Sequence, residues 1–279
     1  MSTDSASTTD TTDTSPGFAT VVRTVVAMVR DRPASLVPFL LAGLVGAAST
    51  LGRIETPYPV GVSSFGASGS LRIPIPLVPR LEPTVELAPT ILPGLRLEYA
   101  VALLGWQVAL AAVTAVTFAV GIWLVASGTA GFAPPIARVG WLAVYVFAVQ
   151  GVSFGAIYVL GSWFTGIGTT VVTVLAAVVV AGGLLVAPAS IVLGGTRPDA
   201  AVLESLAYAG SRPFSSAGLV LCLGILAALF TGVATIVSGV PGLAAGTITS
   251  VAVAGTAHAA VVASIYEHGS ENDVSASDS

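Results

Sequence analysis

Three polar side chains interrupt long apolar stretches of this chain, and they have the greatest capacity for chemistry. Gln107 follows a tryptophan, and Gln150 precedes a short segment with a glycine at each end. His258 continues a series of small or polar residues spaced four apart, Gly246, Ser250 and Ala254, which places them on one face of a helix. Amide and imidazole groups in an apolar setting hydrogen-bond between helices or line a polar path. Both interpretations stay open at this point: packing contacts between helices, or a polar intramembrane site formed by Gln107, Gln150 and His258.

The sequence lacks the residue patterns that most enzyme active sites require. The two histidines are ten positions apart and the single cysteine is Cys222, so no metal-ligand spacing is present. There is no lysine for a phosphate-binding loop. We therefore predict no catalytic, cofactor-binding or metal-binding residues, and no cofactor. The adjacent pair Glu267 and His268 is the one acid–imidazole pair, and it keeps a lipid-modifying enzyme open as a third hypothesis.

The amino-acid composition indicates whether the chain folds in water or in a lipid bilayer. Of 279 residues, 54% are hydrophobic and 9% are charged, with a net charge of −4. Soluble domains carry about 25% charged residues. So few charges cannot cover the surface of a soluble globule, and the sequence predicts an all-α integral membrane protein.

The charges also divide the chain into membrane spans. Uncharged stretches long enough for one or two spans of about 20 residues alternate with arginine-bearing segments. The fold class predicted is a bundle of six transmembrane helices with two cytoplasmic-side amphipathic helices and one long extracellular loop. The expected spans are Ser35–Leu51, Tyr99–Ala126, Val139–Gly161, Thr169–Gly194, Ala217–Gly239 and Ala244–Tyr266, with no Asp, Glu, Lys or Arg inside them.

The domain organisation follows from these spans. Residues 1–16 and 267–279 are acidic, Ser-rich tails that we expect to be disordered. Residues 17–266 form a single transmembrane domain that includes the loop at 52–98, in which eight of the 17 prolines lie. Thr84–Leu87 and Leu71–Ile73 alternate like short edge strands. The loop is expected to be either a passive connector or a functional cap over the bundle.

Arginine positions set the expected orientation. Six of the ten arginines fall on the side of the N-terminus, so both termini are predicted to be cytoplasmic and the protein to lie in the cell membrane. Two amphipathic helices are expected on that side, Gly17–Arg30 and one that starts at Pro198 and ends near Gly210. The candidate interfacial contacts to lipid or to a partner are Arg23, Arg30, Arg32, Arg197 and Arg212.

The two amphipathic helices lead into similar junctions. Each is followed by Arg-Pro-x-Ser and then a span, at Arg32–Ser35 and Arg212–Ser215, which is an offset of 180 residues. Duplication and chance both account for so short a match. With these junctions and six spans, the chain resembles the membrane domain that accompanies some glycerophosphodiester phosphodiesterases. It is also similar to haloarchaeal proteins of unknown function, and the absence of lysine and the acidic tails resemble a halophilic source. The resemblance transfers no catalytic residue, because the hydrolase domain is absent.

Two local features bear on motion and assembly. Pro188 interrupts the fourth span and is a candidate hinge, or a fixed feature that shapes the bundle. Small residues four positions apart, such as Gly151 and Gly155, allow close helix packing within the bundle or between copies.

The leading functional hypothesis is a non-enzymatic multipass protein that acts as a membrane-embedded subunit or organiser. Its expected partners are the lipid bilayer and a protein of a membrane complex, and no nucleic acid. The alternative is a transporter or permease for an uncharged or lipid-like substrate, whose path would use Gln107, Gln150, His258 and the Pro188 kink. A polar face shared by these residues favours transport, whereas scattered buried side chains favour the first hypothesis.

Overall fold

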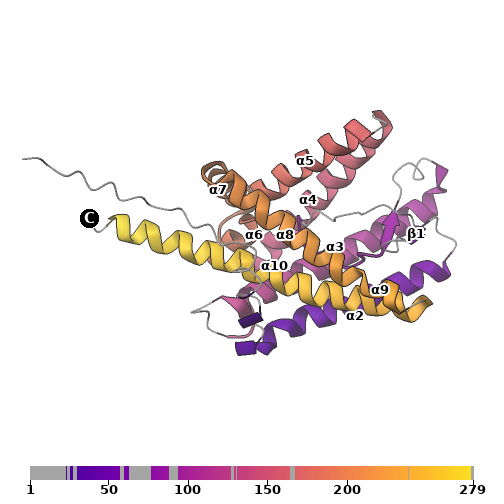
Figure 1. Ribbon diagram of the computed structural model, residues 1–279, viewed down its shortest axis with the longest axis horizontal. Helices are drawn as coiled ribbons and strands as arrows, with labels where there is room; N and C mark the ends of the chain where they lie inside the picture. Colours follow the sequence, from indigo (N-terminus) through magenta and orange to yellow (C-terminus); the bar gives the residue numbers. More distant parts are fainter. Residues whose placement is uncertain are drawn as a thin grey trace, which may run out of the picture.

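In the part of the chain that it describes, the computed structural model is helical apart from loops and one pair of short strands (Figure 1). It describes residues 23, 26–27, 30–56, 60–62, 77–87, 94–126, 129, 131–163, 167–237 and 239–277. Six helices in this part are long and apolar enough to cross a membrane. The prediction of a helical fold with six helices able to span a membrane is therefore confirmed. The spanning helices are α2 (Leu36–Glu55), α3 (Leu97–Val125), α4 (Ile136–Trp163), α5 (Ile167–Leu184), α8 (Pro213–Thr231) and α10 (Gly239–Ser277).

Short elements connect the spans. A 3₁₀ turn, η1 (Pro33–Ser35), precedes α2, and β1 (Val60–Val62) pairs antiparallel with β2 (Val85–Leu87) through Gly61 opposite Glu86. The strand predicted at Thr84–Leu87 is thus present as β2, while Leu71–Ile73 lies outside the described residues. The remaining elements are α6 (Ala187–Ala189), the π-helical turn η3 (Ser190–Gly194), α7 (Pro198–Ser211) and α9 (Val233–Ile236).

Helix α10 lies at the centre of the bundle and packs against α2, α3 and α8. The ring of Phe39 from α2 fits between two glycines, Gly121 of α3 and Gly255 of α10, where an added Cβ would collide with the ring. Phe39 also meets Phe118 edge to face, with ring centroids 6.5 Å apart. Because glycine has no side chain, α2, α3 and α10 can approach closely enough to enclose an aromatic ring.

Helices α4 and α5 leave this bundle in the same direction (Figure 1). Both helices carry exposed apolar side chains: Val152 of α4 is 73% exposed, and Val172 and Val179 of α5 are 66% and 72% exposed. Gly151 and Gly155 face open space. These surfaces are apolar, which is possible only where lipid or another apolar helix covers them.

The first span is longer than predicted, and this corrects the expectation that the spans lack charge. Helix α2 continues past Leu51 to Glu55, and its last turn contains Arg53, which is buried. Arginine is excluded from lipid-facing positions, but it is tolerated where a protein partner neutralises it. Glu82 is that partner, as described below.

The turn before the last span also differs from expectation. Helix α8 ends at Thr231 instead of Gly239, and α9 fills the interval. Gly239 has a φ of +78°, a conformation that glycine adopts without strain, and α10 starts there rather than at Ala244. The Cβ of any larger residue at Gly242 would collide with the carbonyl of Val237, so this turn requires a second glycine.

The fourth span is broken beside Pro188 instead of bent through it. Helix α5 ends at Leu184, and Pro188 lies in the first turn of α6, where a missing N–H costs no hydrogen bond. The freed backbone groups at the break find partners: Ser205 accepts from the Val186 N–H at 3.0 Å, and the Tyr145 hydroxyl donates to the Leu184 carbonyl at 3.0 Å. Satisfied groups hold the break in one geometry.

Helix α7 is present where the second amphipathic helix was expected. It buries Ala201 and Ser205 against the bundle and exposes Leu203 and Leu206. The first expected helix, Gly17–Arg30, lies mostly outside the described residues. The two Arg-Pro junctions share their backbone geometry, since φ and ψ are −135° and 68° at Arg32 and −138° and 56° at Arg212.

Candidate functional site

A segment of the long loop enters the helix bundle, and we call residues Leu77–Thr84 the cover segment. Val78 is buried in the main core, and Leu81 is buried in a cluster with Ala42 of α2 and Leu110 of α3. The Leu81 carbonyl packs directly against Gly46, where a Cβ would overlap it. Gly46 precedes Glu55 by nine residues, so the contact lies about 13 Å below the end of α2 at 1.5 Å per residue.

Non-helical backbone at this depth in a membrane is stable only when protein surrounds it. Two positions of the cover segment, Pro79 and Pro83, are prolines and carry no N–H donor. Thr84 is buried, and its hydroxyl lies 3.1 Å from that of Thr247 on α10. The cover segment is thereby attached to α10 as well as to α2.

A buried ion pair fixes the other side of the cover segment. The Arg53 Nε lies 2.9 Å from the Glu82 Oε1, and the two side chains are 5% and 9% exposed. Ser49 donates to the same carboxylate, and the Trp106 indole N–H donates to the Ser49 hydroxyl at 2.7 Å. The chain from Trp106 through Ser49 and Glu82 to Arg53 joins α3, the cover segment and α2.

The pairing of Arg53 is incomplete. Among the described residues, neither terminal guanidinium nitrogen has a hydrogen-bond partner, although both are buried. A buried guanidinium without its counter-charge is strongly destabilised, so Glu82 is the group that makes this position tolerable.

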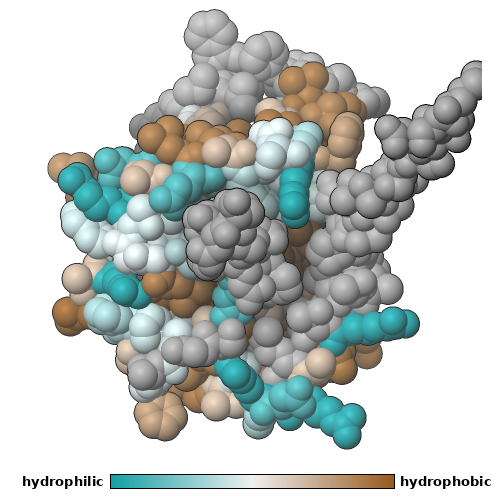
Figure 2. Space-filling view, turned by 90° about the vertical axis from the view of Figure 1, so that its left-hand side faces the viewer, coloured by the Kyte–Doolittle hydropathy of each residue, from teal (hydrophilic) through white to brown (hydrophobic). Residues whose placement is uncertain are grey.

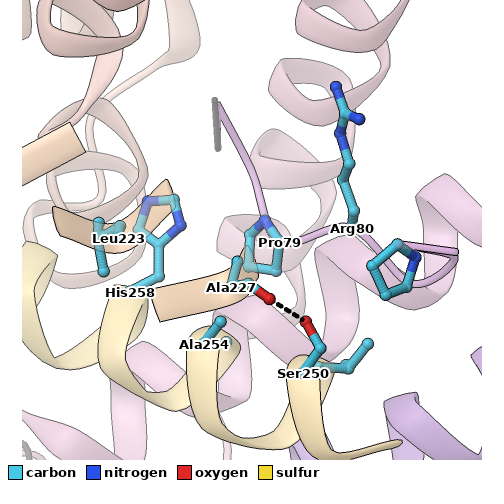
Figure 3. A pocket seen from close by; sticks show the side chains of 10 residues that line it. Pro79, Arg80, Leu223, Ala227, Ser250, Ala254 and His258 are labelled. Atoms are coloured by element: carbon cyan, nitrogen blue, oxygen red, sulfur yellow. Dashed lines mark hydrogen bonds between the residues drawn. The ribbon is translucent and has the colours of Figure 1, made fainter. Parts of the chain in front are cut away.

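A cavity of about 40 Å³ lies beneath the cover segment (Figure 3). Pro79, Arg80 and Pro83 of the cover segment line it on one side, and Ser250 and His258 of α10 line it on another. His258 is 2% exposed, and its ring meets that of Phe118 edge to face at 5.0 Å. Its Nε2 atom is buried and has no hydrogen-bond partner in the described part of the chain.

The three polar residues singled out in the sequence do not form one site. His258 lines the cavity, whereas Gln107 on α3 and Gln150 on α4 are only half-buried and contribute nothing to its lining. Pro188 lies on a different stretch of chain, in α6. The shared polar face that would favour a transport path through all of them is absent among the described residues.

The opposite end of the bundle, where α3 ends and α4 begins, is held by arginines that cap helix C-termini. Arg32 donates to the carbonyls of Val125 and Ala126 at 3.2 and 3.1 Å. Arg138 donates to the carbonyls of Val192 and Leu193, both at 2.8 Å. These carbonyls lack partners within their helices, and a cation there also interacts favourably with the helix dipole.

The arginines flanking α7 are more exposed. Arg197 lies over the ring of Trp141 at 5.8 Å, and Arg212 lies over Tyr208 at 6.0 Å. Arg23 and Arg30 are exposed. Figure 2 views the molecule from this end, and hydrophilic residues are spread over the face beside apolar ones. Of the five candidate interfacial arginines, Arg32 therefore has a clear internal role as a helix cap.

Sequence reasoning missed Arg53, Glu82, Ser49 and Trp106 as a unit. Arg53 was assigned to a loop because a charge commonly marks the end of a span. One signal was present: Glu82 is a lone acid between prolines in an apolar part of the loop. Such a carboxylate needs a buried partner if its segment packs.

Comparisons with known protein families, with curated proteins and with solved structures found no match to this chain. The resemblance to the membrane domain that accompanies some glycerophosphodiester phosphodiesterases therefore remains a prediction, and function must be argued from the geometry above.

Proposed function

We propose that this protein is a non-enzymatic multipass membrane protein that acts as a membrane-embedded subunit or organiser. The observation that carries the proposal is the exposed apolar surface along α4 and α5. On α5, the exposed apolar side chains of Val171, Val172, Val174 and Leu175 span an arc of about 160° of the helix circumference, at 3.6 residues per turn. Helix α10, by comparison, is largely enclosed.

The occupant proposed for this surface is a transmembrane helix of a partner protein. Gly151 and Gly155 lie one turn apart on α4 and face open space, so a second helix can approach the α4 backbone closely. Lipid chains cover apolar side chains equally well, but they gain nothing from a groove of glycines. The cytoplasmic placement of both termini and of the arginine-capped end belongs to this proposal, and it is supported by the positive-inside bias.

The test is co-purification of the tagged protein in mild detergent at molar salt, followed by mass spectrometry. The informative variants are Gly151→Leu and Gly155→Leu, which fill the open groove. Gly140→Leu is the matched control, because Gly140 also faces open space but lies near the other end of α4. We expect a stoichiometric partner that is lost with the first two variants and kept with the control.

Three results would overturn the proposal: a protein recovered alone, a partner retained by Gly151→Leu and Gly155→Leu, or association only with a second copy. The last result would assign the surface to self-association.

Transport of an uncharged or lipid-like substrate is the second candidate. One observation favours it, which is that a loop segment enters the bundle and covers a cavity containing a buried histidine. The positions of Gln107, Gln150 and Pro188 outside this cavity do not support it. Uptake into vesicles containing the purified protein is the measurement that separates the two functions.

A further inference from the structure

Gln150 places an amide inside the membrane, and no described residue satisfies it. The residue lies on α4 about 21 Å from the start of the helix at Ile136 and about 20 Å from its end at Trp163, at 1.5 Å per residue. Wherever a hydrocarbon core of about 30 Å falls along this helix, Gln150 is therefore roughly 9 Å or more from either surface. Its side chain is half-buried and forms no hydrogen bond in the described part of the chain.

An amide at this depth needs a hydrogen-bonding partner. Transfer of an amide from water to an apolar medium is unfavourable unless a hydrogen bond compensates for it. The bilayer core contains no water, and the lipid chains that fill it carry no hydrogen-bonding group. The remaining source is a side chain of a neighbouring helix, since amides in membrane spans hydrogen-bond across helices.

Gln150 borders the open surface of α4. Tyr145 and Val149 are buried and mark the side of α4 that packs against the bundle. On the opposite side, the arc from Gln150 to Gly155 covers about 140° of the helix circumference, at 3.6 residues per turn. This arc also contains Phe147, Gly151 and Phe154, all of which are exposed. A helix that packs on this arc passes within reach of the Gln150 amide.

We propose that Gln150 is the polar contact by which α4 recognises its partner, and that the partner helix carries an asparagine or glutamine at the same depth. The inference rests on the proposed function, because it concerns the helix that occupies this surface. An amide both donates and accepts, so a second amide can match it with a pair of hydrogen bonds. The open glycines let the partner backbone approach, while the rings of Phe147 and Phe154 supply apolar contact.

A second copy of this chain does not supply that amide. Two copies in one membrane have the same orientation, so their α4 helices would pair in parallel about a twofold axis. In such a pair, a residue at one edge of the contact face meets the opposite edge of the other helix. Gln150 lies at one edge of the arc and Gly155 at the other. Each glutamine would therefore meet a glycine, and its amide would stay unpaired.

The first test repeats the co-purification with variants that remove an amide. Gln150→Met keeps the length of the side chain, and it should lower the ratio of partner to tagged protein by roughly three- to thirtyfold, which is the range for one such hydrogen bond between membrane helices. Gln107→Met is the matched control and should retain the partner. Gln107 is also half-buried and unbonded in a span, but it lies between the buried Leu103 and Leu110 on the side of α3 that faces the bundle.

The outcomes separate this inference from the proposed function. A partner retained at the wild-type ratio by Gln150→Met but released by Gly151→Leu would overturn the inference and leave the proposed function standing. Equal loss of the partner in Gln150→Met and Gln107→Met would also overturn the inference, because the effect would then not be specific to α4. A wild-type protein recovered alone would overturn both.

A photo-cross-link identifies the contact without any change at Gln150. The probe is p-benzoylphenylalanine in place of Phe154, which lies one turn from Gln150 and has a similar ring. We expect a cross-link to an apolar segment of about 20 residues that has an asparagine or glutamine within one turn of the labelled position. Substitution of that amide residue by leucine should add no further loss to that of Gln150→Met. A cross-link to lipid alone, to a second copy, or to a segment without an amide would overturn the inference.

Discussion

Removal of the Glu82 carboxylate should destabilise this protein more than any other single loss of charge in the described structure. Glu82→Gln preserves the size of the side chain and an acceptor for Ser49, but it leaves the Arg53 guanidinium without a counter-charge. Both side chains are at least nine-tenths buried, so water cannot replace the carboxylate. Breaking a buried ion pair in this way typically costs about 3–5 kcal/mol.

This cost translates into a measurable shift in melting temperature. At roughly 2–4 °C per kcal/mol for chains of this size, Glu82→Gln should lower Tm by about 10 °C. A thiol-reactive dye can follow unfolding in detergent, because the single cysteine, Cys222, is half-buried in α8. The matched control is Glu98→Gln. Glu98 is 68% exposed and 3.9 Å from Arg96, so its loss should cost less than about 1 kcal/mol.

The reasoning also predicts a rescue. Arg53→Met combined with Glu82→Leu removes both charges and should be much closer to the wild type than either single variant, because no charge is then left buried. Salt gives a second check: the Arg53–Glu82 coupling should persist in molar salt, since buried pairs are screened far less than exposed ones. A Tm for Glu82→Gln within 2 °C of that for Glu98→Gln, or simple additivity in the double variant, would refute the argument.

Three further perturbations probe other contacts, each measured by thermal unfolding against the wild type. Gly121→Ala should destabilise the bundle because its methyl group collides with the Phe39 ring, and Phe39→Leu in the same chain should recover part of the loss; no recovery would argue against the ring as the obstacle. Arg138→Gln should cost about 1–3 kcal/mol by leaving two helix-terminal carbonyls unpaired, and a change below 0.5 kcal/mol would show that water replaces the guanidinium. Ser205→Ala should cost a similar amount because it orphans the buried Val186 N–H, whereas an unchanged Tm would contradict a fixed break before α6.

Local sequence signals predicted the spans because apolar length alone determines whether a helix can cross a bilayer. The number of spans and the helix at 198–211 both followed from such signals. The helix ends were less accurate where a tertiary contact decides them. Helix α2 continues through Arg53 only because Glu82, 29 residues later, pairs with it. No property of the residues around Arg53 carries that information.

The candidate site shows the same limit. His258 could be selected from the sequence, since it is a polar residue on a row of small ones. Its separation from Gln107 and Gln150 could not, because the choice of neighbouring helices is set by packing among glycines and aromatic rings. The sequence left two roles open for the loop, a passive connector or a cap over the bundle, but it did not indicate which loop residues pack among the helices.

The depth of the cover segment nevertheless has a physical explanation in its own composition. A chain that leaves water and passes among membrane helices must satisfy each backbone N–H that it carries, or carry fewer of them. Two prolines in eight residues reduce the donors, and Gly46 lets the Leu81 backbone approach α2. Val78 and Leu81 supply apolar burial, while Glu82 offsets the one charge that α2 brings into the core. Together these features explain how a non-helical segment can lie among spanning helices with its backbone, its apolar side chains and its charge all accommodated.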